Sequence, residues 1–129
     1  MKKLLTKTRP GWMLLFLLAA ASGSLPAHAD MYGALSAYQK GDYPQAFQDY
    51  LALAKLGQPL AQLNVARLYM IGRGIHPSDV LAYAWASLAV ENGEASGRKM
   101  TAVLGPALAP GSKHFARQIT AAYTAEALG

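Results

Sequence analysis

Apolar residues recur at intervals of three and four positions after residue 30, and the sequence shows no sustained alternation of apolar and polar positions. This spacing places apolar side chains on one face of a helix, whereas alternation would indicate a strand. Glycines interrupt the pattern at regular points and are favoured where helices end. The pattern predicts an all-α domain of six helices, at residues 32–40, from 42 to the glycine at 57, from 59 to the glycine at 72, and at 78–92, 94–104 and 110–125.

Start signals support the second and fourth of these helices. Asp42, followed three residues later by Gln45, resembles a capping box, and Pro44 suits a first helical turn. Ser78 is expected as the N-cap of the fourth helix, with Asp79 near the positive end of the helix dipole. The expected buried faces of the first, second, third, fourth and sixth helices are, in that order, Ala34, Leu35 and Tyr38; Ala46, Phe47, Tyr50, Leu53 and Ala54; Ala61, Val65, Leu68 and Tyr69; Leu81, Ala82, Trp85, Leu88 and Ala89; and Phe115, Ile119, Ala122 and Tyr123.

The chain also matches itself when it is shifted along its own sequence. One shift places the second helix on the fourth, and a slightly shorter shift places the first helix on the third. The two shifts differ because the loop before the fourth helix is longer than the loop before the second. The matching pairs are Ala46 with Ala82, Phe47 with Tyr83, Gly57 with Gly93, Asp42 with Ser78, Ala34 with Val65, Tyr38 with Tyr69, and Gly41 with Gly72. We therefore expect a short α-α solenoid of about three antiparallel helix pairs, with Trp85 between the second and third pairs.

The segment at 1–29 has the three parts of a secretory signal peptide. Four basic residues lie within the first ten positions, an apolar run follows at 12–21, and small residues stand at −3 and −1 from the bond between Ala29 and Asp30. The apolar run is short for a membrane anchor, which needs roughly 20 residues, although an uncleaved anchor is the alternative. The sequence predicts cleavage at this bond, which would leave a helical repeat domain at 30–129.

The net charge of +5 belongs largely to this leading segment. The chain has 12 Lys and Arg against 7 Asp and Glu, and four of the basic residues precede residue 30, which leaves eight bases against seven acids in 30–129. The high isoelectric point therefore does not indicate nucleic-acid binding, which needs a basic stripe on the folded domain. The chain has no cysteine, which excludes disulfides, thiolate metal sites, a cysteine nucleophile and a lipidated N-terminal cysteine.

One segment resembles a Sel-one-like repeat, a relative of the tetratricopeptide repeat. It reads Ala61-Gln-Leu-Asn-Val-Ala-Arg-Leu-Tyr69-Met-Ile-Gly72-Arg-Gly74-Ile75, then Ser78-Asp79, Ala82-Tyr83-Ala84-Trp85, Leu88-Ala89 and Gly93. Residues 34–57 resemble a preceding copy with a shortened loop, and 97–125 resemble the less regular closing helices of such repeats. The repeat signature implied by the resemblance is Ala61, Tyr69, Gly72, Gly74, Ala82, Trp85 and Gly93.

The resemblance implies an α-solenoid that binds other proteins, often as an adaptor in the bacterial envelope. A cysteine-rich subgroup of the family, reported to bind β-lactams, uses a disulfide in each repeat, and this chain has no cysteine. Ala66 occupies a position where the family usually has glycine.

Candidate catalytic and metal-binding groups are sparse. His76 and His114 are far apart in the sequence, and neither has a metal-ligating partner at i+3 or i+4. Helix capping explains Ser78 and Asp79, and the Gly-x-Gly at 72–74 follows a helix and lacks the Lys-Ser/Thr pair of a phosphate-binding loop. We expect no catalytic residue, metal or cofactor, and a non-catalytic interaction module of the periplasm. The alternative is a small-molecule binder or small hydrolase whose concave site the sequence does not reveal.

The expected binding face is the concave surface, which the first helices of successive pairs line in a solenoid. Asn64 and Arg67 lie on the third helix, one position before Val65 and Leu68 and about 100° around the axis from the core face. The shift that places the first helix on the third equates Ser36 with Arg67. Arginine is favoured at interfaces because its guanidinium stacks and donates in pairs. We expect Asn64, Arg67 and Ser36 to contact a protein or peptide of the cell envelope; a solvated helix surface is the alternative.

Overall fold

The computed structural model describes residues 30–129, apart from the side chains of 127 and 128, and all the regular secondary structure of this part of the chain is helical. The predicted all-α class is therefore confirmed. The elements in order are α2 (Met31–Gln39), α3 (Tyr43–Lys55), α4 (Pro59–Ile71), α5 (Asp79–Glu91), the 3₁₀ turn η1 (Ala95–Gly97), α6 (Arg98–Leu104), the 3₁₀ turn η2 (Gly105–Ala107) and α7 (Pro110–Leu128).

The helices begin where the capping residues predict. Asp42 Oδ1 accepts a hydrogen bond of 3.2 Å from the backbone N–H of Gln45, and Ser78 Oγ accepts one of 3.2 Å from that of Leu81. The reciprocal half of the predicted capping box is not formed, because Gln45 Nε2 donates instead to Asp49, 2.8 Å away. Each cap satisfies one of the backbone donors that a helix start leaves unpaired.

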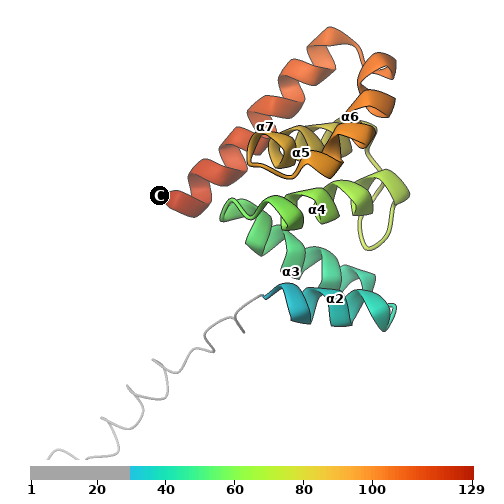
Figure 1. Ribbon diagram of the computed structural model, residues 1–129, viewed down its shortest axis with the longest axis vertical. Coiled ribbons are helices and arrows are strands. Elements are labelled where there is room, and N and C mark those ends of the chain that lie inside the picture. Colours follow the sequence, from blue (N-terminus) through green and yellow to red (C-terminus); the bar gives the residue numbers. More distant parts are fainter. Residues whose placement is uncertain (1–29) are drawn as a thin grey trace, which may run out of the picture.

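The first four helices pack in sequence order, α2 on α3, α3 on α4 and α4 on α5, and they are stacked along the long axis of the molecule (Figure 1). Aromatic side chains fill the space between neighbouring helices, as the sequence predicts. The rings of Phe47 on α3 and Tyr69 on α4 meet edge to face, with centroids 5.3 Å apart. Small residues allow the backbones to approach closely, and these include the fully buried Ala34, Ala46, Ala54, Ala61, Ala66, Ala82, Ala86 and Ala89.

Helix α4 is buried on two sides because it lies between α3 and α5. The predicted face of Ala61, Val65, Leu68 and Tyr69 is buried, and Gln62 and its neighbour Leu63 are buried as well. Gln62 is polar, but its amide is paired. Its Nε2 donates to the carbonyl of Ala54 at 3.1 Å and its Oε1 accepts from Asn92 Nδ2 at 3.0 Å, which ties α3 and the end of α5 to α4.

Residues 72–77 form a loop that lies against the start of α3. Gly72 has a φ of 80° and caps α4 in the left-handed conformation. Gly74 has a φ of 75°, and a Cβ at this position would lie 2.2 Å from the carbonyl oxygen of Tyr43. Position 74 therefore requires glycine for two reasons: its backbone conformation is left-handed, and the neighbouring backbone leaves no room for a Cβ.

The segment that follows α5 is irregular. The predicted helix at 94–104 is divided into η1 and the short helix α6, and buried Gly97 lies at the division. A Cβ on Gly97 would lie 3.0 Å from the carbonyl oxygen of Ala86 and 3.0 Å from Val90 Cγ2, so glycine lets this segment approach α5 closely. Helix α7 runs back across the stack and contacts both α5 and α3 (Figure 1).

The predicted buried face of α7 is correct in part: Ile119 and Tyr123 are partly buried and Tyr123 packs against the core, but the other two positions are wrong. Phe115 is 57% exposed and Ala122 is exposed, whereas Ala116 and Thr120 are buried. The close packing of α7 on α5 selects small side chains, and the Thr120 hydroxyl is satisfied because it donates to the carbonyl of Arg117 at 3.1 Å. Burial of a hydroxyl that bonds to its own helix carries little penalty.

Trp85 lies on the buried face of α5, as the sequence predicts. It projects from α5, is fully buried, and packs against Tyr123 of α7 with ring centroids 5.8 Å apart. The ammonium group of Lys55, on α3, also lies over the ring of Tyr123, 4.9 Å from the ring centroid. The C-terminal helix is therefore held to α5 and to α3 by contacts of the Tyr123 ring.

Candidate functional site

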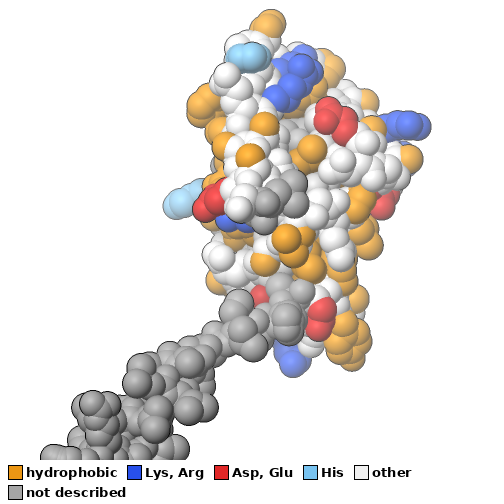
Figure 2. Space-filling view, turned by 90° about the vertical axis from the view of Figure 1, so that its left-hand side faces the viewer, with side chains coloured by type: hydrophobic (Ala, Val, Ile, Leu, Met, Phe, Trp, Pro, Cys, Tyr) orange, Lys and Arg blue, Asp and Glu red, His pale blue; other side chains and the backbone are white. Residues whose placement is uncertain are grey.

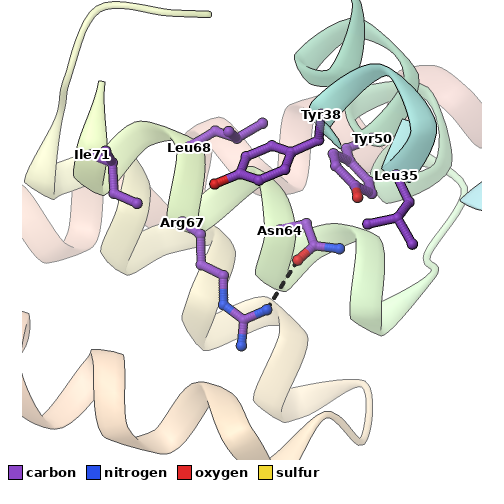
Figure 3. Close-up of a pocket in the computed structure, with 7 residues that line it drawn as sticks. All are labelled: Leu35, Tyr38, Tyr50, Asn64, Arg67, Leu68 and Ile71. Carbon is purple, nitrogen blue, oxygen red and sulfur yellow. Dashed lines mark hydrogen bonds between the residues drawn. The ribbon is translucent and has the colours of Figure 1, made fainter. Parts of the chain in front are cut away.

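A hollow of about 270 Å³ opens between α2, α3 and α4. We call it the first hollow. Its lining is mainly apolar, with two polar side chains from one helix (Figure 3), and it consists of Leu35, Tyr38, Tyr50, Asn64, Arg67, Leu68 and Ile71. Leu35, which the sequence assigns to a buried face, is 45% exposed because it forms the outer wall of this hollow.

Asn64 and Arg67 are brought together on the exposed side of α4. Residues three positions apart are neighbours on a helix surface, and Arg67 Nη1 donates to Asn64 Oδ1 at 3.1 Å. Asn64 is half-buried, whereas Arg67 is exposed and reaches away from the α2 side chains (Figure 3). The asparagine thus fixes the orientation of a guanidinium at the rim of the hollow.

A second hollow of about 370 Å³ lies on the other flank of α4, against η1 and α6. Sequence reasoning did not find this second hollow. Arg67 lines both hollows, and the complete lining of the second is Leu63, Arg67, Met70, Ser96, Lys99, Met100 and Val103. The two hollows therefore share Arg67 as a lining residue, and we call the pair, which spans α2, α4 and α6, the α2–α4–α6 groove.

Arg67 also acts electrostatically on groups beside it. Burial raises the pKa of the Tyr50 hydroxyl, the nearby Tyr38 adds to this rise, and the positive charge of Arg67 opposes it. The pKa of Glu94 is lowered because its carboxylate accepts hydrogen bonds from the side chain and backbone of Ser96, with a smaller contribution from Arg67. Tyr50 is therefore a neutral hydroxyl and Glu94 a carboxylate at physiological pH.

An arginine clamp holds one wall of the first hollow. Arg73 Nη1 donates to the hydroxyl of Tyr38 at 2.7 Å, and its guanidinium lies 4.9 Å from the ring centroid of Tyr43. The rings of Tyr38 and Tyr43 meet edge to face at 5.2 Å. Sequence reasoning did not single out Arg73, because the clamp joins residues that are distant along the chain. The loop at 72–77 thereby positions Tyr38 over the hollow.

Ser36, the third residue of the predicted binding face, and the two histidines do not line the groove. Ser36 is half-buried and does not belong to the lining of either hollow. His76 and His114 are both exposed, on the loop before α5 and in the first turns of α7. Within residues 30–129, no three His, Cys, Asp or Glu side chains are grouped in a way that could hold a metal ion.

The residues of the predicted repeat signature lie in the core or at turns. Ala61, Ala82 and Trp85 are fully buried, and Tyr69 is 7% exposed. The three glycines of the signature, at 72, 74 and 93, all have positive φ values of 75–108°. These residues therefore shape helix packing and turns, and the groove is lined by other positions.

The predicted signal peptide lies outside the described residues, and Ala29 is its last member. Asp30, on the other side of the predicted cleavage bond, is the N-cap of α2: its side chain accepts from the backbone N–H of Gly33 and its carbonyl accepts from that of Ala34. None of the helices from Met31 to Leu128 is both long and apolar enough to cross a membrane.

Comparison with known proteins gives no relative from which function could be transferred. No model of a known protein family matches the sequence, no curated protein matches it significantly, and no solved structure matches the fold significantly. The relation to Sel-one-like repeats and the solenoid arrangement therefore remain proposals that rest on the residues of this chain.

Proposed function

We propose that this chain is a non-catalytic interaction module of the cell envelope, built as a short α-α solenoid of the Sel-one-like type. In this proposal the α2–α4–α6 groove is the concave surface, and it receives a segment of another envelope protein. Asn64 and Arg67 contact that segment, and Ser36 lies beside the groove and does not contribute to it. The leading segment at 1–29 directs the chain to the periplasm and is removed.

The observation that carries this proposal is the meeting of two apolar hollows at Arg67. Each hollow is bordered by large apolar side chains that remain exposed in the isolated chain, such as Ile71 at 53% and Val103 at 72%. Interfaces commonly combine apolar anchors that fill pockets with an arginine that donates hydrogen bonds. On the face shown in Figure 2, acidic and basic side chains are dispersed among hydrophobic and other uncharged ones.

The direct test is site-specific photo-crosslinking in envelope extracts. A benzophenone amino acid replaces Ile71, which lines the first hollow and is 53% exposed, or Phe115, which is 57% exposed and lies on α7 outside the two hollows. The matched exposure makes the two positions equally accessible to any protein in the extract. A discrete cross-linked product is expected from position 71 alone, and equal products from both positions would overturn the proposed surface.

A substitution experiment tests the polar contacts. The double variant Asn64→Ala with Arg67→Ala is expected to keep the far-ultraviolet circular dichroism of the parent and to lose the cross-linked product at position 71. The control variant Lys40→Ala with Gln48→Ala also removes one positive charge and one amide, from exposed positions outside both hollows. Retention of the product by the folded groove variant would exclude Asn64 and Arg67 from the interface.

Export is tested separately. The intact mass of the protein isolated from the envelope is expected to correspond to a chain that begins at Asp30, since the basic start, the apolar run and the small residues before this bond fit signal cleavage. A mass that retains the segment at 1–29 would show an anchored protein instead.

A further inference from the structure

The groove carries positive charge and no negative charge of its own. Its two hollows are lined by the cations Arg67 and Lys99, and no Asp or Glu of the described residues belongs to either lining. Glu94, the acid on which Arg67 acts, has its carboxylate engaged by the backbone and hydroxyl of Ser96 at the start of η1. A carboxylate that enters the groove would therefore meet Arg67 without a competing acid in the lining.

The apolar groups of the groove lie on either side of this charge. Leu35 and Ile71 border the first hollow, whereas Met70 and Val103 border the second. These four make up half of the eight large apolar side chains that are exposed within residues 30–129. The concentration of half of them around one arginine indicates two apolar subsites that flank a cationic one.

Helix geometry sets the distance between the two subsites. Met70 and Ile71 are adjacent positions on α4, so their side chains point about 100° apart, toward opposite hollows. Any ligand that fills both hollows must cross α4 over Arg67, and a helix with its side chains is about 10–12 Å wide. In an extended segment, residues i, i+2 and i+4 face one side and span about 13 Å, which matches this crossing.

We propose that the partner segment is an extended acidic peptide in which a carboxylate stands between two large apolar side chains at positions i and i+4. The apolar side chains enter the two hollows, and the carboxylate at i+2 accepts hydrogen bonds from the guanidinium of Arg67. Arg67 directs Nη1 to Asn64 and has further N–H donors for the ligand. This inference rests on the proposed function, because it names the chemistry of the segment that the groove receives.

The test uses blocked synthetic peptides of stated sequence. Acetyl-Ser-Leu-Ser-Glu-Ser-Leu-Ser-amide is titrated into the full-length protein, and binding is followed by nuclear magnetic resonance of the methyl groups of Leu35, Met70 and Val103. Peptides with Gln or Lys in place of Glu are titrated in parallel. The Glu peptide is expected to bind about two- to fivefold more tightly than the Gln peptide, the range for exposed ion pairs, and the Lys peptide more weakly than both.

Two variants locate the preference for a carboxylate. Arg67→Gln is expected to remove the difference between the Glu and Gln peptides and to leave the binding of the Gln peptide unchanged. Lys40→Gln removes a charge of the same sign outside both linings and is expected to keep the difference. A preference that survives Arg67→Gln would overturn the assignment of the acidic subsite to this residue.

The outcomes separate this inference from the proposed function. Equal binding of the three peptides, with shifts at the same methyl groups, would overturn the acidic partner and leave an apolar groove in place. Absence of binding by every peptide, with a discrete cross-linked product at position 71, would overturn the extended segment but not the interaction surface. Absence of that product as well would overturn the proposed function itself.

Discussion

Replacement of Trp85 by alanine tests the packing of α7 on α5. The indole is fully buried between α5 and α7. Burial of roughly 150–200 Å² of aromatic surface, at about 25 cal/mol per Å², stabilises the fold by about 4–5 kcal/mol. The contact with Tyr123 adds about 1 kcal/mol. The indole N–H has no hydrogen-bond partner within the described part of the chain, and its removal offsets about 1–2 kcal/mol of this loss.

The net cost expected for Trp85→Ala is therefore about 3–5 kcal/mol, within the range measured for large-to-small substitutions of aromatic core residues. For a folded part of about 100 residues, each 1 kcal/mol lowers the midpoint of thermal unfolding by about 4–8 °C. The melting temperature of Trp85→Ala, measured by circular dichroism at 222 nm, should fall by more than about 10 °C. The melting temperature of Trp85→Phe should fall less, because this variant retains an aromatic ring and removes the unpaired N–H.

Phe115→Ala is the matched control for this measurement. Phe115 is also an aromatic residue on the predicted apolar pattern, but it is 57% exposed. Its replacement should change the free energy of unfolding by less than about 1 kcal/mol, as is usual for surface positions. A shift of only one or two degrees for Trp85→Ala, or equal shifts for the two alanine variants, would refute the placement of these side chains.

Two further substitutions probe the joints between the helices. Gly41→Ala should cost about 1–2 kcal/mol, because Gly41 has a φ of 81° and a Cβ there would meet no other atom. Gly74→Ala should cost at least twice as much, because its Cβ would also lie 2.2 Å from the carbonyl oxygen of Tyr43. Equal melting temperatures of the two variants would contradict the loop contact. Gln62→Ala and Asn92→Ala should show a coupling free energy of about 1 kcal/mol in a double-mutant cycle measured by urea denaturation, because the amide of Asn92 donates a hydrogen bond to that of Gln62. Additive effects of the two substitutions would exclude that hydrogen bond.

Local signals account for the parts of the fold that the sequence predicts. A cap such as Asp42 or Ser78 acts within its own first turn, and a glycine such as Gly72 acts at its own helix end, so both can be recognised without knowledge of the tertiary structure. The faces of α3, α4 and α5 follow because large apolar residues and alanines coincide there. On α7 they do not coincide, because the larger Phe115 is exposed whereas the smaller Ala116 is buried.

Only part of the groove, the residues that α4 contributes to the first hollow, can be predicted from the sequence. Asn64 and Arg67 follow from their angular distance to the buried face of α4, which is a property of one helix. The second hollow depends on where η1 and α6 lie, and that placement depends on the close approach of Gly97 to α5. No periodicity in the sequence encodes this approach, so the two-sided character of the site at Arg67 emerges only from the tertiary packing.

The loop at 72–77 explains how the first hollow keeps its shape. Self-comparison identifies 72–77 as an extension relative to the first hairpin, and in the structure this extension contacts that hairpin. Gly74 lets the loop backbone approach Tyr43, and Arg73 holds Tyr38 by a hydrogen bond from its guanidinium. Tyr38 in turn lines the first hollow. The loop residues thus fix a wall of the first hollow that α2 contributes.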